Sequence, residues 1–471
     1  MNENGSVIKA AGGSKNKNLV EIYISLISHT NVGKTSLTRT LLRRDIGDVR
    51  DEPHVTQKSE AYPFLKSEES ALFLWDTPGF GDIRKVLNRL KNEGGATGWI
   101  LHHVVDRFSQ RSLFCSIEAL KNIRTSGDLI LYLVNGAEDP EYAGYPKLEL
   151  ELLSYFEKKV VVVVNQISSE TMGSTSRDKG IYESEWIAKW KKFLGKYKFV
   201  VDVLPLDAHH PIPEMEENLL QSIALNVGEE KHEACQRLVD ARLKERESDR
   251  LECLFAAWKV FSFAMNQAKT PSGEEREDLD KMQEELARMM SQFSESLMSI
   301  CRISVADQAV IHAEVKDLKD RNRKISEKKA GLWTGFLSGA VSGLTADLIA
   351  GGLSFGGGAL LGGVSGWLAA YYGTKGFNQL LRSGTTDLRW SDQFLAELML
   401  SLLSLYLRVL HHGRARGVLY FSDERETEFW LSRLSNHKKE VLSNVETMLQ
   451  HEDESEREVL FKQTFEWLTK F

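Results

Sequence analysis

A lysine, a threonine and a glycine near the N-terminus have the types and the spacing of a loop that binds phosphate groups. Residues 28–36 read SHTNVGKTS and follow an apolar run. The pattern G-x-x-x-x-G-K-[ST] is matched at its last three positions, Gly33, Lys34 and Thr35, while Ser28 stands at its first. Backbone amides of such a loop surround phosphates, the lysine reaches the β and γ phosphates, and the hydroxyl ligates Mg²⁺. We therefore expect a nucleotide to be bound here by Asn31, Val32, Gly33, Lys34, Thr35 and Ser36.

An aspartate and a glycine follow about forty residues later, at the end of another apolar run. The segment 72–79 reads LFLWDTPG. An aspartate at a strand end can hold Mg²⁺ through water, and the N–H of Gly79 is placed to meet a γ-phosphate. The two motifs together predict a GTPase rather than a kinase or an ATPase, with Asp76 at the metal.

Two segments resemble the motifs of the Era-like branch of the GTPases related to translation factors. They are NVGKTSL at residues 31–37 and DTPGF at residues 76–80. The resemblance implies that Thr56 is the first-switch threonine that contacts Mg²⁺ and the γ-phosphate. It also implies that Asn31 helps to coordinate K⁺, as in some relatives. We accordingly expect Lys34, Thr56 and Gly79 to act in catalysis and Thr35, Thr56 and Asp76 to hold Mg²⁺.

The base-recognition motif departs from these relatives, which carry N-K-x-D. The chain has Asn165, Gln166 and Ser168 at the conserved positions. Serine carries no charge and accepts hydrogen bonds from guanine less strongly than aspartate does, so guanine selectivity is in question. The later segment Leu206-Asp207-Ala208-His209 resembles the loop in which an alanine N–H meets the guanine O6, which makes Ala208 the candidate.

The residue after the DxxG motif also departs from small signalling GTPases, which place a water-orienting glutamine there. Phe80 occupies this position, and phenylalanine cannot orient a water molecule. We expect slow intrinsic hydrolysis that a cation, a partner or self-association accelerates.

Short apolar runs must form the elements that position these residues. They cover residues 19–27, 71–75, 129–134, 160–164 and 199–204 and alternate with helical patterns. Nearly continuous Val, Ile and Leu runs indicate strands buried on both faces of a largely parallel sheet. The sequence predicts an α/β domain with helices on both faces of the sheet over residues 19–225, after a disordered tail at 1–18.

The second half of the chain is helical in pattern, which predicts an all-α domain. Residues 226–330 form a predicted helical or coiled region with a break at 270–273, and residues 377–471 form a C-terminal helical region. Apolar residues recur every three or four positions in one stripe, which predicts bundle packing or, as an alternative, a partner-binding helix. The stripe consists of Leu279, Met282, Leu286, Met289, Phe293, Leu297 and Ile300.

A glycine-rich apolar segment at 331–376 holds fourteen of the 35 glycines. Asp347 is the only charged residue between Leu332 and Thr374. Stripes of glycine allow close helix contact, so we expect a helical hairpin. A preceding basic cluster between residues 316 and 329, within a charged helix expected over about 304–329, favours an anionic membrane surface. A soluble hairpin packed on the helical domain is the alternative.

Composition narrows the classes of partner. The formal net charge of −7 argues against a nucleic-acid partner. Four scattered cysteines and the absence of an apolar N-terminal segment fit a cytoplasmic protein. We expect a guanine nucleotide, a membrane lipid or membrane protein, and another copy of the chain as partners, at the cytoplasmic face of the membrane.

The whole arrangement resembles a bacterial family of predicted Era-like GTPases with a C-terminal helical domain of unknown function. That resemblance implies a GTP-hydrolysing switch whose helical half engages a membrane or a partner. Two alternatives remain open: a dynamin-like membrane assembly protein, and a scaffold with a degenerate nucleotide site.

Overall fold

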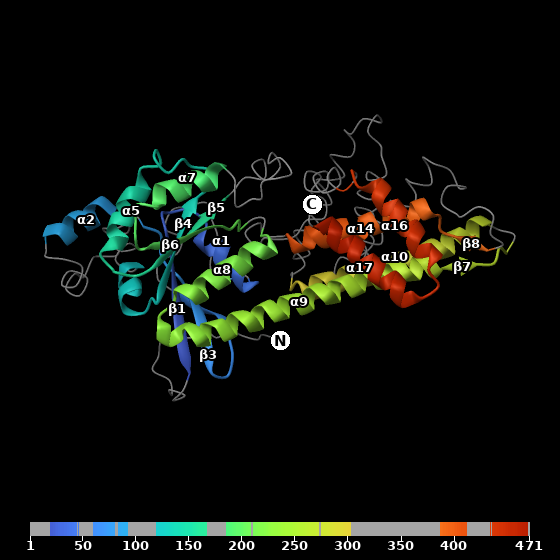
Figure 1. Cartoon of the computed structure of the whole chain (residues 1–471), viewed down its shortest axis with the longest axis horizontal. Coiled ribbons are helices and arrows are strands. Elements are labelled where there is room, and N and C mark those ends of the chain that lie inside the picture. The colour runs from blue at the N-terminus through green and yellow to red at the C-terminus, as the bar shows by residue number, and fades with distance from the viewer. Residues whose placement is uncertain are drawn as a thin grey trace, which may run out of the picture. The chain divides into compact units, whose positions relative to one another are not determined.

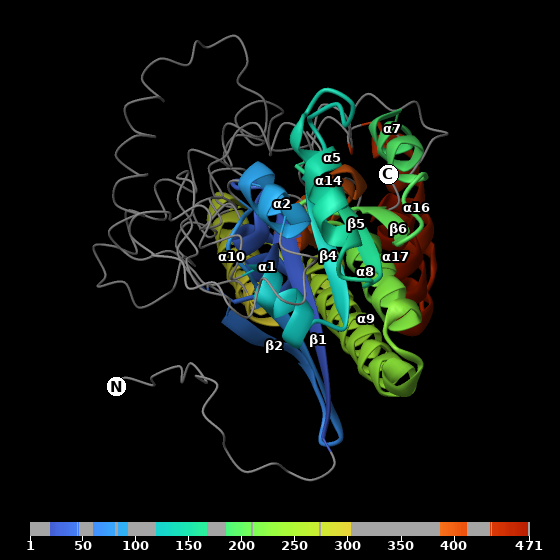
Figure 2. The ribbon, with the colours of Figure 1, turned by 90° about the vertical axis from the view of Figure 1, so that its left-hand side faces the viewer.

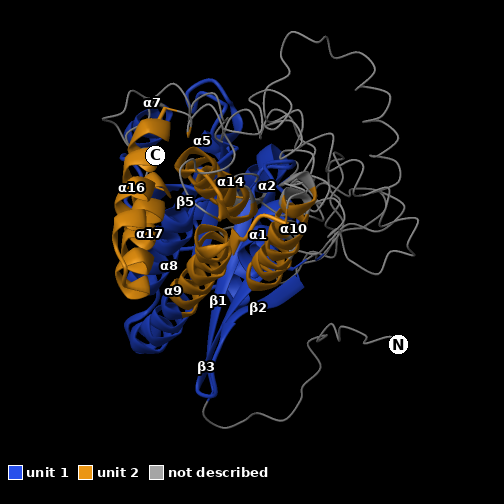
Figure 3. Cartoon of the chain, turned by 90° about the vertical axis from the view of Figure 1, so that its right-hand side faces the viewer, with its two compact units in different colours: residues 1–244 blue, residues 245–471 orange. Residues whose placement is uncertain are grey.

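The computed structural model describes residues 19–44, 46, 60–80, 83–92, 119–166, 185–208, 211–272, 275–302, 387–411, 434 and 436–469 (Figure 1). The chain divides into two compact units, residues 1–244 and 245–471, coloured separately in Figure 3. The division falls inside one long helix, α9 (Glu229–Asn266). The domain limits predicted from the sequence stay predictions.

The first unit is built on a six-stranded sheet with the order β2-β3-β1-β4-β5-β6 (Figure 2). The strands β1 and β3 to β6 run parallel, and β2 is antiparallel to β3. The strands are β1 (Val20–Ser28), β2 (Glu60–Lys66), β3 (Ser70–Asp76), β4 (Leu129–Asn135), β5 (Val160–Asn165) and β6 (Val200–Pro205). The mostly parallel α/β fold predicted from the sequence is confirmed.

The central strands match the predicted apolar runs because both of their faces are covered. Every residue of β5 is buried, which is the environment that five consecutive valines favour. The edge strand β2 was not among the predicted strands. It carries Pro63 and only one fully buried residue, Leu65, so its sequence lacks the apolar run that marks the others.

Helices from different parts of the chain cover the sheet. One core joins even-numbered residues of β4 and β5 to α2 (Ile83–Asn92), α5 (Tyr145–Ser154), α7 (Glu185–Leu194) and the helical residues 119–125. Helix α1 (Lys34–Leu42) packs on β1 and β3, and α8 (Pro213–Asn226) packs on β6. Because β1 and β3 to β6 are parallel, their carboxyl ends share one edge of the sheet, where ligands bind in folds of this kind.

The second unit is a helical bundle around one apolar core. It contains the later part of α9 with α10 (Glu275–Ile300), α14 (Asp392–Leu410), α16 (Lys438–Gln450) and α17 (Glu454–Thr469). The break predicted at 270–273 separates α9 from α10, and most of the predicted stripe on α10 is buried or partly buried in this core. The bundle packing expected for that stripe is confirmed.

In the second unit, a short pair of antiparallel strands joins two segments that are distant in the sequence. It joins β7 (Ala268–Lys269) to β8 (Leu388–Arg389), and the indole of Trp390 donates to Gln267 Oε1 at 2.7 Å. The all-α pattern of the second half predicted neither strand, because each has only two residues and no alternation can be read from it.

Within the described residues, no helix combines the length and the apolar character that crossing a bilayer requires. Helix α14, the most apolar of these helices, is buried in the second core instead. The predicted helix over 304–329 and the hairpin at 331–376 lie outside the described residues.

Candidate functional site

The phosphate-binding loop connects β1 to α1 through left-handed backbone. Gly33 has φ 94°, and a Cβ added there would lie 2.8 Å from Asn165 Nδ2, so glycine is required. Asn31 has φ 63°, a conformation that asparagine adopts more readily than most residues. This conformation accounts for an asparagine at position 31, and its role toward K⁺ stays a prediction. Gly33 offers no capping side chain, and an uncapped helix N-terminus is an environment suited to anions such as phosphate.

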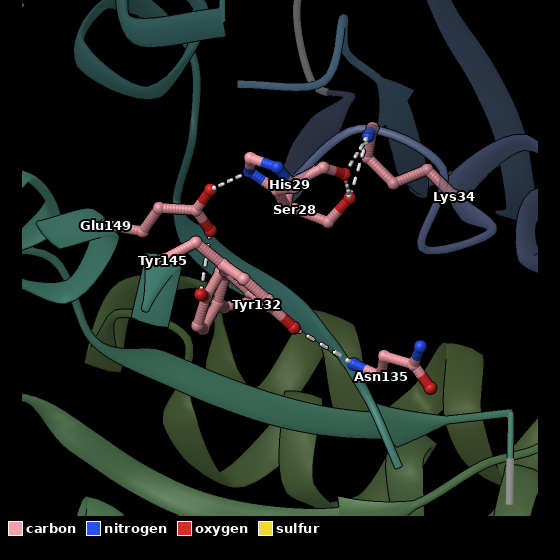
Figure 4. Close-up of polar contacts among 7 residues, drawn as sticks. All are labelled: Ser28, His29, Lys34, Tyr132, Asn135, Tyr145 and Glu149. Carbon is pink, nitrogen blue, oxygen red and sulfur yellow. Dashed lines mark hydrogen bonds and ion pairs between the residues drawn. The ribbon is translucent and has the colours of Figure 1, made fainter. Parts of the chain in front are cut away.

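The lysine of the loop is held at its base. Lys34 is buried, and its Nζ donates to Ser28 Oγ at 2.8 Å and to the carbonyl of His29 at 3.5 Å (Figure 4). Ser28 replaces the first glycine of the pattern, and its side chain is fully buried. The serine therefore supplies an oxygen that positions the lysine ammonium group.

Asp76 and Thr35 lie together at the end of β3 and the start of α1. The Thr35 hydroxyl donates to Asp76 Oδ2 at 2.7 Å, whereas Asp76 Oδ1 is buried without a hydrogen-bond partner in the described part of the chain. Burial raises the pKa of Asp76 to about 6, against the opposing effects of the Thr35 hydroxyl and the Lys34 charge. A buried carboxylate with an unsatisfied oxygen is a place for a cation.

These residues fit Mg²⁺, which prefers oxygen ligands and is often bound by one or two protein groups together with water and substrate phosphates. Among the described residues there is no group of three or more His, Cys, Asp or Glu side chains that could hold a metal by itself. An ion at Thr35 and Asp76 would thus take its other ligands from water and from substrate phosphates. At such a site, binding of the metal would depend on binding of the nucleotide.

The segment after β3 runs beside the phosphate loop. The N–H of Phe80 donates to the carbonyl of Ser28 at 2.9 Å, and the Phe80 ring is fully buried in the core beneath. A Cβ on Gly79 would lie 3.0 Å from the Cα of Thr30 and 3.1 Å from Lys34 Nζ, so a side chain would crowd the lysine. Phe80 therefore serves packing and cannot orient an attacking water.

The asparagine at the end of β5 joins two loops. Asn165 is fully buried, its Nδ2 donates to the carbonyl of Val32 at 2.8 Å, and its Oδ1 accepts from the N–H of Ala208 at 3.0 Å. Residues 33, 165 and 208, far apart in sequence, are brought together as expected from the motifs. The roles assigned to Asn165 and Ala208 toward the base stay predictions.

A buried polar network that was not predicted from the sequence supports the first half of the loop. Glu149 of α5 is fully buried, and it accepts from His29 Nδ1 at 2.9 Å and from the Tyr132 hydroxyl at 2.7 Å (Figure 4). The His29 ring stacks on Tyr145 with centroids 4.7 Å apart. Glu149 shares a helix face with Tyr145, Leu152 and Leu153, so a charged residue on an apolar face was the available signal.

Replacing Glu149 by glutamine is expected to flatten the pH dependence of stability. Burial raises the pKa of Glu149 against the effects of His29 and Tyr132, so the folded protein holds this proton more tightly than the unfolded chain. The wild type should therefore lose unfolding free energy as the pH rises from the ordinary carboxyl value through the raised one. Glutamine does not titrate, so the variant lacks this pH-dependent part of the unfolding free energy. Urea unfolding at a series of pH values measures the difference, with Glu151→Gln, half-exposed on the same helix, as the control. Parallel profiles for all three proteins would contradict it.

Two of the positions singled out in the sequence, Thr56 and Ser168, lie outside the described residues, so their roles stay predictions. Of the remaining loop residues, Val32 and Ser36 are buried at the loop and at the first turn of α1.

The fold and the site define a P-loop GTPase of the Era type joined to a helical domain. The family model described as "50S ribosome-binding GTPase" matches residues 23–166, and the one described as "Domain of unknown function (DUF3482)" matches residues 192–465. The second match covers more than half of the chain. The chain belongs to this DUF3482 family and carries an Era-like GTPase domain ahead of the family's own region.

Similar proteins include GTPase Era from Geobacter sp. (strain M21), 30% identical over 146 residues, which are 31% of this chain and 39% of that protein. GTPase Era from Campylobacter fetus subsp. fetus (strain 82-40) is 35% identical over 71 residues, 15% of this chain and 24% of that protein. The chain thus spans less than half the length of these curated relatives.

Solved structures that are similar to parts of this chain include a variant of Era from Aquifex aeolicus bound to GDP and AlF₄⁻, with 17% identity and a TM-score of 0.32. Another is Era in complex with MgGDPNP and nucleotides 1506–1542 of 16S ribosomal RNA, with 16% identity and a TM-score of 0.32. Each likeness covers 45% of this chain and 58% of the other.

Proposed function

We propose that this chain binds GTP with Mg²⁺, hydrolyses it slowly to GDP and phosphate, and uses the bound nucleotide as a switch. The observation that carries the proposal is the buried Asp76 carboxylate, bonded to Thr35 through one oxygen and unsatisfied at the other. In a GTPase domain, that arrangement has a clear use only when a cation and phosphates are present. The GTPase class of the domain supplies the identity of the nucleotide.

Each residue of the site has a distinct role in this proposal. The ammonium of Lys34 leaves Ser28 for the phosphate oxygens, and the first amides of α1 bind the same group. Thr35 and Asp76 would hold Mg²⁺, which would supply positive charge to neutralise the phosphate oxygens. The N–H of Gly79 is proposed to donate to the γ-phosphate, and Thr56 is proposed to join it. Because Phe80 is buried, water activation falls to another group, which accounts for a slow intrinsic rate.

The response of the helical unit is the second part of the proposal. Segments that touch the γ-phosphate change order when it leaves, and this change is the usual output of a GTPase. We propose that the helical unit converts it into engagement of a partner. The membrane attachment and the K⁺ dependence predicted from the sequence stay predictions.

Asp76→Asn is expected to lower the kcat/KM for Mg²⁺-dependent GTP hydrolysis by about 100-fold, because the amide is a poor ligand for a hard cation. Since a neutral amide is less costly to bury than a carboxylate, the variant should be at least as stable as the wild type at pH 7 in EDTA. Phosphate release with Mg²⁺ or with EDTA and urea unfolding measure the two effects.

Asp240→Asn, on the exposed face of α9, serves as the control and should match the wild type. Full activity of Asp76→Asn, or hydrolysis by the wild type in EDTA, would overturn the assignment of the metal site. Failure of the wild type to bind any guanine nucleotide would instead favour a scaffold with a degenerate site.

A further inference from the structure

Two cysteine side chains meet in the helical unit. Cys253 lies on α9, and Cys301 follows directly after the last residue of α10. Cys253 is buried in the second core with 2% exposure, and Cys301, which is partly exposed, packs against the same core. Both are free thiols, and a hydrogen bond joins their side chains. The two sulfur atoms are therefore in contact, although the residues are far apart in sequence.

The end of α10 is held beside α9 by groups other than the sulfur atoms. The guanidinium of Arg302 donates to the carboxylate of Glu245 on α9. Glu245 lies about two helical turns before Cys253 on the same helix. The N–H of Cys301 donates to the carbonyl of Leu297 at 2.9 Å, so Cys301 continues the hydrogen bonding of α10. The ion pair and the helix end thus keep Cys301 close to Cys253 independently of the thiols.

The two thiols differ in which one keeps its proton. The hydrogen bond to Cys301 and burial both raise the pKa of Cys253, so this residue stays a thiol. As the donor of the shared hydrogen bond, Cys253 favours negative charge on the sulfur of Cys301, which is also the more exposed of the two. An accessible sulfur with thiolate character beside a protonated partner is the arrangement of cysteines that react with oxidants and then pair.

We propose that Cys253 and Cys301 are an oxidative modification site, which forms a reversible disulfide when the protein meets a peroxide. The Cys301 thiolate attacks one peroxide oxygen and the O–O bond breaks, which gives a sulfenic acid and a hydroxide that takes up the proton released by Cys301. The Cys253 sulfur then attacks the Cys301 sulfur, the S–O bond breaks, and the departing hydroxide leaves as water with the Cys253 proton. The two sulfur atoms lose two electrons, and the peroxide gains them.

The disulfide would tie α9 to the end of α10. The structure describes residue 302 and next residue 387, so the bond would lie directly before the stretch of sequence that contains the glycine-rich segment at 331–376. Cys253, Cys301 and the ion pair beside them belong to the second unit, whereas the proposed nucleotide site belongs to the first. The proposal therefore goes beyond the proposed GTPase activity and does not depend on it. The alternative is that the two thiols only fill space in the core.

The test treats the reduced full chain with hydrogen peroxide, alkylates the remaining thiols in denaturant and maps unreduced tryptic peptides by mass spectrometry. A cross-link between peptides 251–259 and 289–302 is expected, and dithiothreitol should remove it. Oxidation should raise the melting temperature of the helical unit by about 5 °C or more, because the cross-link restricts the unfolded chain. Cys235, also on α9, is fully buried, and burial raises its pKa to about 12, so it is the internal control and should remain alkylatable.

Cys253→Ser separates the two steps. Its Cys301 should stop at the sulfenic acid, so labelling of Cys301 by dimedone should exceed that of the wild type several-fold, and oxidation should no longer raise the melting temperature. Cys235→Ser, a change of the same type on the same helix, should form the cross-link like the wild type. A wild type in which both thiols remain free after peroxide, or in which either pairs with Cys115 or Cys235 instead, overturns the proposal, and this decision does not depend on the folding of any variant.

Discussion

Lys34→Ala is expected to lower GTP affinity by about 100-fold or more and to abolish measurable hydrolysis. The Nζ of Lys34 lies at the base of the loop, bonded at 2.8 Å to Ser28 and buried from solvent. Removing one member of a buried, hydrogen-bonded charge pair costs about 2–5 kcal/mol of binding, which corresponds to that loss. Equilibrium titration with a fluorescent GTP analogue and a phosphate-release assay measure the two effects.

The folded state must be checked separately, because Lys34 also lowers the pKa of Asp76 through its charge. Lys34→Met keeps most of the stem and removes only the charge, so it should bind GTP as poorly as the alanine variant. Lys66→Ala, at an exposed position on the edge strand β2, is the control and should bind like the wild type. Binding by Lys34→Met within a few fold of the wild type would show that the phosphates lie elsewhere.

Phe461→Ala is expected to destabilise the helical unit by about 3–5 kcal/mol, the usual cost of removing a buried phenyl ring and leaving a cavity. Phe461 of α17 is fully buried. The centroid of its ring lies 5.1 Å from the ring centroid of Phe261, 5.4 Å from that of Trp258 and 5.5 Å from that of Phe465. It therefore joins α9 to α17 at the centre of the second core. Urea unfolding followed by circular dichroism measures the shift.

GTP binding should survive this substitution under native conditions, because the GTPase unit has its own core. Val459→Ala, half-exposed on the same helix, is the matched control and should change stability by less than about 0.5 kcal/mol. If Phe461→Ala matched Val459→Ala in the urea midpoint, the second core would not be organised around this ring.

The parts of the site and of the fold that are formed by residues adjacent in sequence could be predicted from the sequence. The phosphate loop is one strand, one turn and one helix start, so Gly33, Lys34 and Thr35 were identifiable by spacing alone. Asp76 was identifiable because a polar residue ends an apolar strand. The valine-rich run of β5 was equally clear, since a strand buried on both faces has a continuous apolar pattern.

Pairing between distant segments could not be predicted, because nothing local encodes it. Ser28 appeared as a lost glycine, whereas the structure makes it the hydrogen-bond partner of Lys34. Tyr132 and Glu149 lie more than a hundred residues after His29 in sequence. They reach His29 only because β4 and α5 pack beside the loop.

The sequence by itself therefore determined the class of this protein, the five parallel strands of its sheet and the residues at the phosphate end of its site. Only the tertiary structure decided which groups support that site, and it joined Ala208 to the phosphate loop through the buried Asn165. The physical reason is that local motifs follow backbone geometry, whereas a buried polar group takes its partners from whichever segments the packed sheet brings into contact.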